Sequence, residues 1–535
     1  MQSFLAIYGL IEWFLRGLSM AAQAAAVGGV AYFVFTIRPF RPAERGQGSS
    51  FERLCMRLLF WSASVLCVAK LLSALALIAY LVGSAGVDVE TAASADAVTF
   101  DVISACAGFA LACLARAPAF SAPLLQVTLS WIIVGAHAGV THAASRVAAS
   151  PMLLGAETLH LYALAAWIGG LPYFIASLRM LRESDARALL ALRFSFTSLV
   201  SVAVIVATGV FMALPYVGTL DGLYQTNYGL LLSTKLVLLL FLICLGAANF
   251  LAIRKLRRKG SAMPQHVPVL AEAEVGIGII TVLCAVALAS SPLSAESRAA
   301  RPETTEISKR FELAWPRLEA PAFAQLSAAQ APESAAGATA VERTPFDIAW
   351  SEALHHYAAL VVVAMGLAAL AAQTRRVKPL TRHWPLLFLG LAAYLFVVAD
   401  EDAWPLGKIG FFESLAVPRI AQHKLMIAMV AGFALFEWRA RLNKTKAAWP
   451  SYMFPLTIAA AAAFLLTHYG HTGDKNEVLI EISHTPVALL GVIAATARWL
   501  EIRLPASAIS RVAAMVWPLA FTAAGAFLLL YRETA

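Results

Sequence analysis

FSFTSLVSVAVIVATGVFMAL, residues 194–214, is a run of apolar and small side chains without a charged residue. At about 1.5 Å per helical residue it is long enough to cross the roughly 30 Å hydrocarbon core of a bilayer. Similar runs recur along a chain of 535 residues that is 60% hydrophobic and 14% charged, whereas soluble chains carry about 25% charge. The sequence therefore predicts an all-α polytopic membrane protein and excludes water-soluble enzyme folds, coiled coils and disordered scaffolds.

We expect about fourteen transmembrane helices. The first is expected to be a span rather than a cleaved signal, because Glu12 and Arg16 interrupt it and no positive region precedes it. The fourteen apolar segments lie at roughly 5–36, 58–82, 97–115, 122–142, 157–178, 194–214, 228–252, 272–292, 351–372, 384–399, 418–437, 451–469, 481–499 and 511–531.

Lys and Arg gather in every second loop, and the loops between them are poor in basic residues and often acidic. Because basic loops remain in the cytoplasm, the acidic loops and both termini are predicted to be periplasmic. The net charge of +9 is explained by the basic loops that orient the protein in the membrane. No nucleic-acid partner is therefore expected.

One periplasmic loop is much longer than the others and is rich in Ala, Pro, Ser and Glu, without His, Met or Cys. Such a composition is typical of a linker and gives it no strong metal ligands. We therefore expect an eight-helix membrane domain at 1–293, a periplasmic linker loop at 294–350 and a six-helix membrane domain at 351–535.

The histidines are distributed unevenly. Ionisable groups inside a membrane usually line a cavity or pathway, and neutral imidazole is a common ligand for Cu, Zn and Fe. The alternative is that each membrane-embedded histidine forms a hydrogen bond in helix packing, which is the commoner role for a single residue. Nine of the eleven histidines map to outer loops or outer halves of spans, namely His137, His142, His160, His355, His356, His423, His468, His471 and His484.

Helical spacing relates several donors in the first half of the chain. His160 and Trp167 are seven residues apart and share a helix face, and Glu157 lies one turn before His160. Glu157 is placed to ligate a metal or to orient the imidazole from behind. Gly169 and Gly170 would let a neighbouring helix approach closely, so they and Trp167 are expected in helix packing.

The second half offers nitrogen, sulfur and oxygen donors near the same surface. His423 and Met426 share a face, and His468 and His471 are three residues apart. Thioether suits Cu(I), and imidazole also suits Cu(II) and Zn(II), so the oxidation state stays open. The candidate metal ligands are His142, His160, His355, His356, His423, Met426, His468, His471 and His484.

These motifs resemble the CopD family of bacterial inner-membrane copper proteins. The resemblance lies in THA at 141–143 and in LHLYALAAWIGG at 159–170, and it covers roughly residues 15–295. The last six spans are similar to a C-terminal extension of longer members. Further matching positions are Tyr228, Gly229, Lys235, Asn249, Glu274, Ser291 and Pro292.

The resemblance implies movement of copper across the inner membrane together with a periplasmic copper-binding partner. It implies that His142 and His160 correspond to family histidines, and that Trp167, Gly169 and Gly170 correspond to the family's helix motif. His137 has no counterpart in the motif.

The sequence thus favours a copper-binding protein that transports or imports copper ions through the lipid bilayer, and no enzyme, because no nucleophile-elbow, phosphate-loop or zincin spacing is present. One alternative is a haem-binding electron-transfer or metal-reductase protein, because histidines on facing helices can also ligate haem. Another is an assembly or sensor component that holds copper without transporting it.

Overall fold

The structure is a computed structural model. It describes residues 2–38, 48–116, 122–142, 150–181, 184–259, 264, 266–296, 301–322, 345–373, 380–442, 449–467, 475–504 and 507–533. In these ranges the regular structure is helical, with a single isolated β-bridge between Ala403 and Ile409. The predicted all-α class is confirmed.

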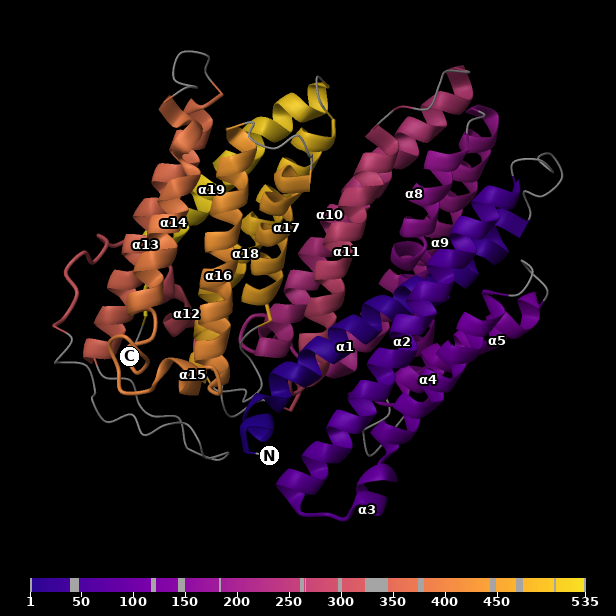
Figure 1. The fold of residues 1–535 in the computed structure, drawn as a ribbon, viewed down its shortest axis with the longest axis horizontal. Helices are drawn as coiled ribbons and strands as arrows, with labels where there is room; N and C mark the ends of the chain where they lie inside the picture. Colours follow the sequence, from indigo (N-terminus) through magenta and orange to yellow (C-terminus); the bar gives the residue numbers. More distant parts are fainter. Residues whose placement is uncertain are drawn as a thin grey trace. The chain divides into compact units, whose positions relative to one another are not determined.

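The helices form two compact units, each described separately below (Figure 1). The N-terminal unit comprises residues 8–218 and 235–290. Its elements are most of α1 (Gln2–Ala31), η1 (Tyr32–Ile37), α2 (Gly48–Ala85), α3 (Val89–Ala93), α4 (Asp96–Leu114), α5 (Pro123–Ala138), α7 (Pro151–Leu164), η3 (Ala165–Gly169), α8 (Leu171–Met180), α9 (Ser184–Val217), most of α10 (Asn227–Lys259) and α11 (His266–Ser290).

The C-terminal unit comprises residues 2–7, 219–234 and 291–535. Its elements are η4 (Leu220–Leu223), the start of α10, α12 (Thr304–Arg310), α13 (Pro345–Ala371), η6 (Leu380–His383), α14 (Pro385–Val398), α15 (Phe411–Ser414), α16 (Pro418–Arg441), α17 (Trp449–Leu465), α18 (Lys475–Arg503) and α19 (Ala508–Leu529). The domain boundaries expected from the sequence, at 293 and 350, stay a prediction.

Each of the fourteen expected apolar segments coincides with a helix or a continuous series of helices. Within the described residues, eleven helices are long and apolar enough to cross a membrane. The other three segments are the shorter apolar helices Pro123–Ala138, Pro385–Val398 and Trp449–Leu465. The chain is therefore a polytopic membrane protein, and the count of fourteen spans stays a prediction.

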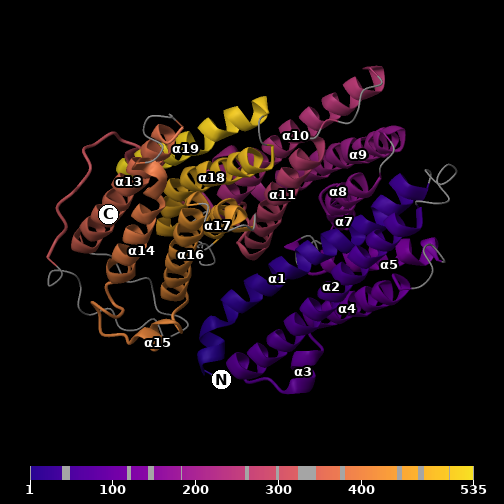
Figure 2. The same ribbon diagram turned by 45° about the horizontal axis from the view of Figure 1, so that its top comes forward.

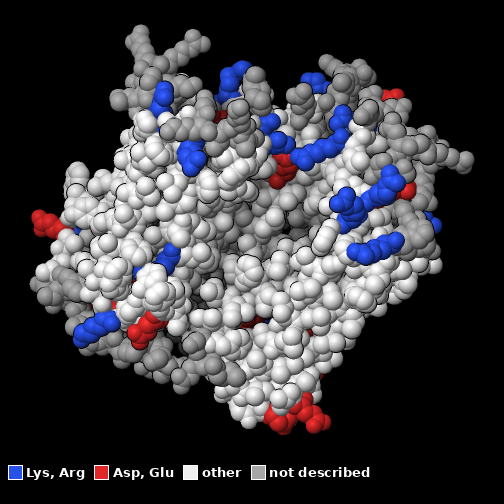
Figure 3. Space-filling view, in the orientation of Figure 1, with Lys and Arg blue, Asp and Glu red and all other residues white. Residues whose placement is uncertain are grey.

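Charge separates the two ends of the N-terminal unit. Figure 3 shows the Lys and Arg side chains, with a few acidic ones among them, toward its upper end and a cluster of acidic side chains near α3 at its lower end. Between these ends, α2, α4 and α5 run side by side in both ribbon views (Figures 1 and 2). The pattern matches the alternation of basic and acidic loops in the sequence.

Glycines bring α1 and η3 into direct backbone contact. A Cβ atom at Gly169 would lie 1.8 Å from the carbonyl oxygen of Ala24, and one at Gly28 would lie 2.3 Å from that of Ala165. Both approaches exclude any larger residue. The element η3 is π-helical and carries Trp167; such turns are rare and frequently occur at functional sites.

Aromatic rings fill the core of the C-terminal unit. Trp384, Phe433, Phe454 and Trp517 are almost completely buried. Phe454 packs edge-on against Phe433, Trp384 and Trp517, with ring centroids 5.3 to 6.1 Å apart. These contacts hold α14, α16, α17 and α19 together.

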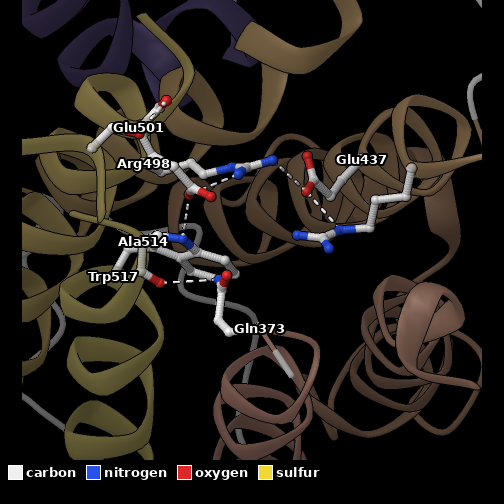
Figure 4. Close-up of polar contacts among 8 residues, drawn as sticks. Gln373, Glu437, Arg498, Glu501, Ala514 and Trp517 are labelled. Atoms are coloured by element: carbon white, nitrogen blue, oxygen red, sulfur yellow. Dashed lines mark hydrogen bonds and ion pairs between the residues drawn. The ribbon is translucent and has the colours of Figure 1, made fainter. Parts of the chain in front are cut away.

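A buried network of charged side chains borders this core (Figure 4). Glu437 is fully buried, and one of its carboxylate oxygens accepts hydrogen bonds from Arg441 at 2.8 Å and from Arg498 at 2.9 Å. Arg498 also pairs with Glu501 at 2.7 Å, and the Trp517 indole donates to Glu501 at 2.7 Å. The network ties α16, α18 and α19 together, and its two positive and two negative charges balance.

Candidate metal-binding histidines

His160 lies on α7 and faces α9. Its Nδ1 atom is 2.9 Å from Oγ1 of Thr208, and that hydroxyl group donates its proton to the carbonyl oxygen of Val204 at 2.6 Å. Because a threonine has a single hydroxyl proton, its oxygen accepts from the Nδ1–H group of His160. The acceptor lone pair of His160 is then on Nε2, the form in which imidazole binds a metal ion.

Lys235 of the neighbouring helix α10 acts electrostatically on His160 and on Glu157. The three side chains come from two helices of the N-terminal unit. Glu157, expected to orient His160, is thus influenced by the same lysine as His160.

A second polar group lies deeper in the same unit. Glu274 of α11 is 3% exposed and accepts a hydrogen bond from the side-chain amide of Asn249 at 2.8 Å. The indole of Trp167 also hydrogen-bonds to this carboxyl group. Glu274 was absent from the candidate ligands, although its place inside an apolar run was the signal that could have singled it out.

Two further histidines of the outer set, His142 and His137, also belong to this unit. His142 is partly buried at the end of the described segment 122–142. His137 faces Gln23, with Nδ1 and Oε1 3.2 Å apart, and lines a cavity of about 80 Å³. The same cavity holds the buried ion pair of Lys70 and Asp101, whose Nζ and Oδ1 atoms are 2.7 Å apart.

In the C-terminal unit, two candidate histidines meet. The rings of His355 on α13 and His484 on α18 are 5.8 Å apart and edge to face. Nδ1 of His355 is 2.8 Å from the carbonyl oxygen of Ser351, and Nδ1 of His484 is 2.8 Å from that of Ile480. A carbonyl oxygen only accepts, so both Nδ1 atoms donate, and in the neutral imidazoles the acceptor lone pair is on Nε2.

Tyr531 completes this cluster, which we call the His355–His484 pair. Its ring stacks on His355 with centroids 4.2 Å apart, and its hydroxyl donates to Glu533 at 2.8 Å. The carboxyl group of Glu533 also accepts a hydrogen bond from the hydroxyl group of Ser351. The chain after α19 therefore supports the imidazole of His355.

His356 has a different environment although it is adjacent in sequence. It is completely buried, with Nδ1 2.9 Å from the carbonyl oxygen of Arg317 and Nε2 3.0 Å from that of Tyr531. Both ring nitrogens thus contact main-chain acceptors. This histidine joins α13 to two distant segments of the chain.

His423 is held by a carboxylate. Its Nδ1 atom is 2.7 Å from Oδ1 of Asp400, which is 5% exposed. A carboxylate behind an imidazole fixes its orientation and raises its basicity, as in many metal sites. Met426 is partly buried one turn further along α16, and His468 and His471 lie outside the described residues.

The sequence predicted that these imidazoles gather in one pocket. Across the described ranges, no three His, Cys, Asp or Glu side chains are placed to hold one metal ion. The described candidate histidines are divided between the units, with His142 and His160 in the N-terminal unit and His355, His356, His423 and His484 in the C-terminal unit. The shared pocket stays a prediction.

Comparison with known proteins identifies a related segment. Residues 188–288 match the family described as "Copper resistance protein D", CopD. The chain is also 31% identical over 139 residues to the "Copper transport protein CutJ" of Bacillus subtilis (strain 168), a stretch that makes up 25% of each chain. The chain thus aligns with about a quarter of that relative's length. No solved structure matches significantly.

The matched segment contains residues found at the polar contacts of the N-terminal unit. Thr208, Lys235, Asn249 and Glu274 all lie within residues 188–288. Together with the apolar helices, this match makes the chain a multi-pass protein of the bacterial inner membrane. The expected resemblance to the CopD family is thereby confirmed, and residues 188–288 carry it.

Proposed function

We propose that this protein binds copper ions near the periplasmic surface and transports them into the cell. The CopD match and the name of the Bacillus relative support a role in copper resistance or transport in general. The observation that carries copper binding is the His355–His484 pair, in which two helices present imidazoles with the same tautomer.

The chemistry of this pair suits a transported ion. Two Nε2 lone pairs bind copper, and the main-chain contacts of the Nδ1 atoms keep the rings oriented before the ion arrives. Because few ligands hold the ion, it can leave by ligand exchange. A periplasmic copper-binding protein would deliver it. His423 and Met426, with His468 and His471, would supply further ligands in this unit.

His160 provides the corresponding position in the N-terminal unit, with His142 as a second ligand. The Thr208 hydroxyl fixes the tautomer of His160, and Glu157, Trp167, Gly169 and Gly170 support its helix. His356 takes a packing role in this proposal, because both of its ring nitrogens contact main-chain carbonyl groups.

Copper flux into proteoliposomes, measured with the purified full-length protein, tests this proposal. We expect His355→Ala with His484→Ala, and separately His142→Ala with His160→Ala, to abolish uptake. His266→Ala, at the start of α11 and outside these contacts, is the matched control and should transport normally. Unchanged flux in both double variants would contradict the pathway.

Two further measurements separate the alternatives. Copper binding without flux in the unmodified protein would favour a copper-holding assembly or sensor component. A Soret band in the purified protein, lost in the same variants, would favour haem binding instead.

A further inference from the structure

A groove of about 840 Å³ lies between α7 and α9 in the N-terminal unit. This volume is within the range of about 300 to 1,000 Å³ typical of small-molecule sites. Its walls are mainly apolar, with Leu159, Tyr162 and Ala163 from α7 and Leu189, Phe196 and Val200 from α9.

One end of the groove is charged. Arg193 of α9 lines it, and among the residues that the structure describes, no hydrogen-bond acceptor contacts the buried Nη1 atom of its guanidinium. A buried donor without an acceptor is costly, more so when it is charged. An anionic group on a bound molecule would supply the acceptor that this Nη1 atom lacks.

The opposite charge lies nearer the membrane surface. Asp185, in the first turn of α9, is exposed and also lines the groove. The backbone positions of Asp185 and Arg193 are eight residues apart, or about 12 Å along the helix. Because helical side chains lean toward the N-terminus, the long Arg193 side chain can extend along the groove toward the level of Asp185.

From the helix start inward, Asp185 and Arg193 are arranged in the same order as the groups that they would bind in a zwitterionic phospholipid, the ammonium and then the phosphate. In a bilayer the phosphate lies deeper than the terminal ammonium group, just as Arg193 lies deeper than Asp185. A primary ammonium donates hydrogen bonds to a carboxylate, which a quaternary ammonium cannot do. The apolar walls beyond Arg193, ending near Trp131 and Val204, suit an acyl chain.

We propose that this groove is a binding site for one phosphatidylethanolamine molecule, with its phosphate on Arg193, its ammonium on Asp185 and an acyl chain between α7 and α9. The inner end of the groove contains Val204, whose carbonyl accepts the hydroxyl proton of Thr208, the partner of His160. A bound lipid would thus contact the helix segment that orients His160.

Native mass spectrometry of the detergent-purified full-length protein, titrated with synthetic phosphatidylethanolamine, phosphatidylcholine or phosphatidylglycerol, tests the site. We expect phosphatidylethanolamine to be retained in preference to the other two. Arg193→Gln should weaken its retention by about tenfold or more, as loss of a charged hydrogen bond predicts. Asp185→Asn should remove the preference over phosphatidylcholine. Arg254→Gln and Asp221→Asn are matched controls outside the groove and should change nothing.

Val200→Trp fills the groove without altering either charge, so it tests the acyl-chain position even if Arg193→Gln does not fold. It should also reduce retention. Equal retention of the three lipids, a preference for phosphatidylglycerol, or retention unaffected by Arg193→Gln and Val200→Trp would overturn the proposal and leave only nonspecific annular lipid.

Discussion

The two units use buried carboxylates in different ways. In the C-terminal unit, Glu437 lies between the guanidinium groups of Arg441 and Arg498. In the N-terminal unit, Glu274 accepts hydrogen bonds from the uncharged groups of Asn249 and Trp167. A carboxylate between two cations on different helices joins those helices through charge. The carboxylate held by neutral donors has no charged partner in these contacts.

Their histidines differ as well. His160 in the N-terminal unit contacts a threonine, whereas His355 and His484 in the C-terminal unit lie ring to ring. The CopD match falls on residues 188–288, so the segment with family likeness and the paired imidazoles are in different parts of the chain. We infer that transport requires both units, and the following predictions separate their roles.

The largest expected effect is on the Glu437 network. Replacing Glu437 by Gln leaves two buried arginines without their shared anion, and breaking a buried ion pair costs about 3–5 kcal/mol. We therefore expect a clear fall in the melting temperature of the purified protein. Glu312→Gln, at an exposed position, is the control. An unchanged melting temperature for Glu437→Gln would show that the network does not stabilise the unit.

The next effect concerns copper affinity. His355→Ala or His484→Ala alone should weaken copper binding by about 100-fold, because even residues behind a ligand contribute about 10- to 100-fold. The double variant should lose little more, since each imidazole depends on the other to hold the ion. Competition titration with a chelator measures this, and additive losses would contradict a shared ion.

A smaller effect is expected at Thr208. Thr208→Val removes the acceptor that fixes the tautomer of His160, so copper transport should fall by about tenfold. Thr197→Val, on the same helix, is the matched control, because its hydroxyl bonds only the main chain of α9 in the structure. Equal flux for both variants would show that Thr208 does not position His160.

The smallest effect is at the surface ion pair of Lys475 and Glu306, whose Nζ and Oε1 atoms are 2.5 Å apart. The hydrogen bond from Lys475 lowers the pKa of Glu306 below its usual value. The stabilisation is therefore complete at neutral pH and is lost as the pH falls through this lowered pKa. Lys475→Ala should cost less than about 1 kcal/mol at neutral pH and nothing in strong acid, as thermal unfolding at both pH values would reveal.

The helices were predictable because each buried span needs an apolar run of fixed length. Residues 194–214, for example, lie within α9 (Ser184–Val217). The partners of the polar groups were harder to predict from the sequence. Arg441 lies one turn after Glu437, so that contact was visible in the sequence, but Arg498 is 61 residues away. Spacing along one helix contains no information on such a distant partner.

The same limit applies to the histidines. The sequence placed His355 and His356 together as candidate ligands, although adjacent residues on a helix point about 100° apart. Only the folded chain distinguishes His355, beside His484, from His356, between two carbonyl oxygens.

X-ray absorption spectroscopy of the copper-loaded, full-length protein tests the central claim most directly. We predict imidazole scattering from two histidine ligands, which disappears in the His355→Ala, His484→Ala double variant and persists in His266→Ala. A spectrum that is identical in the double variant and the unmodified protein would contradict copper binding by this pair.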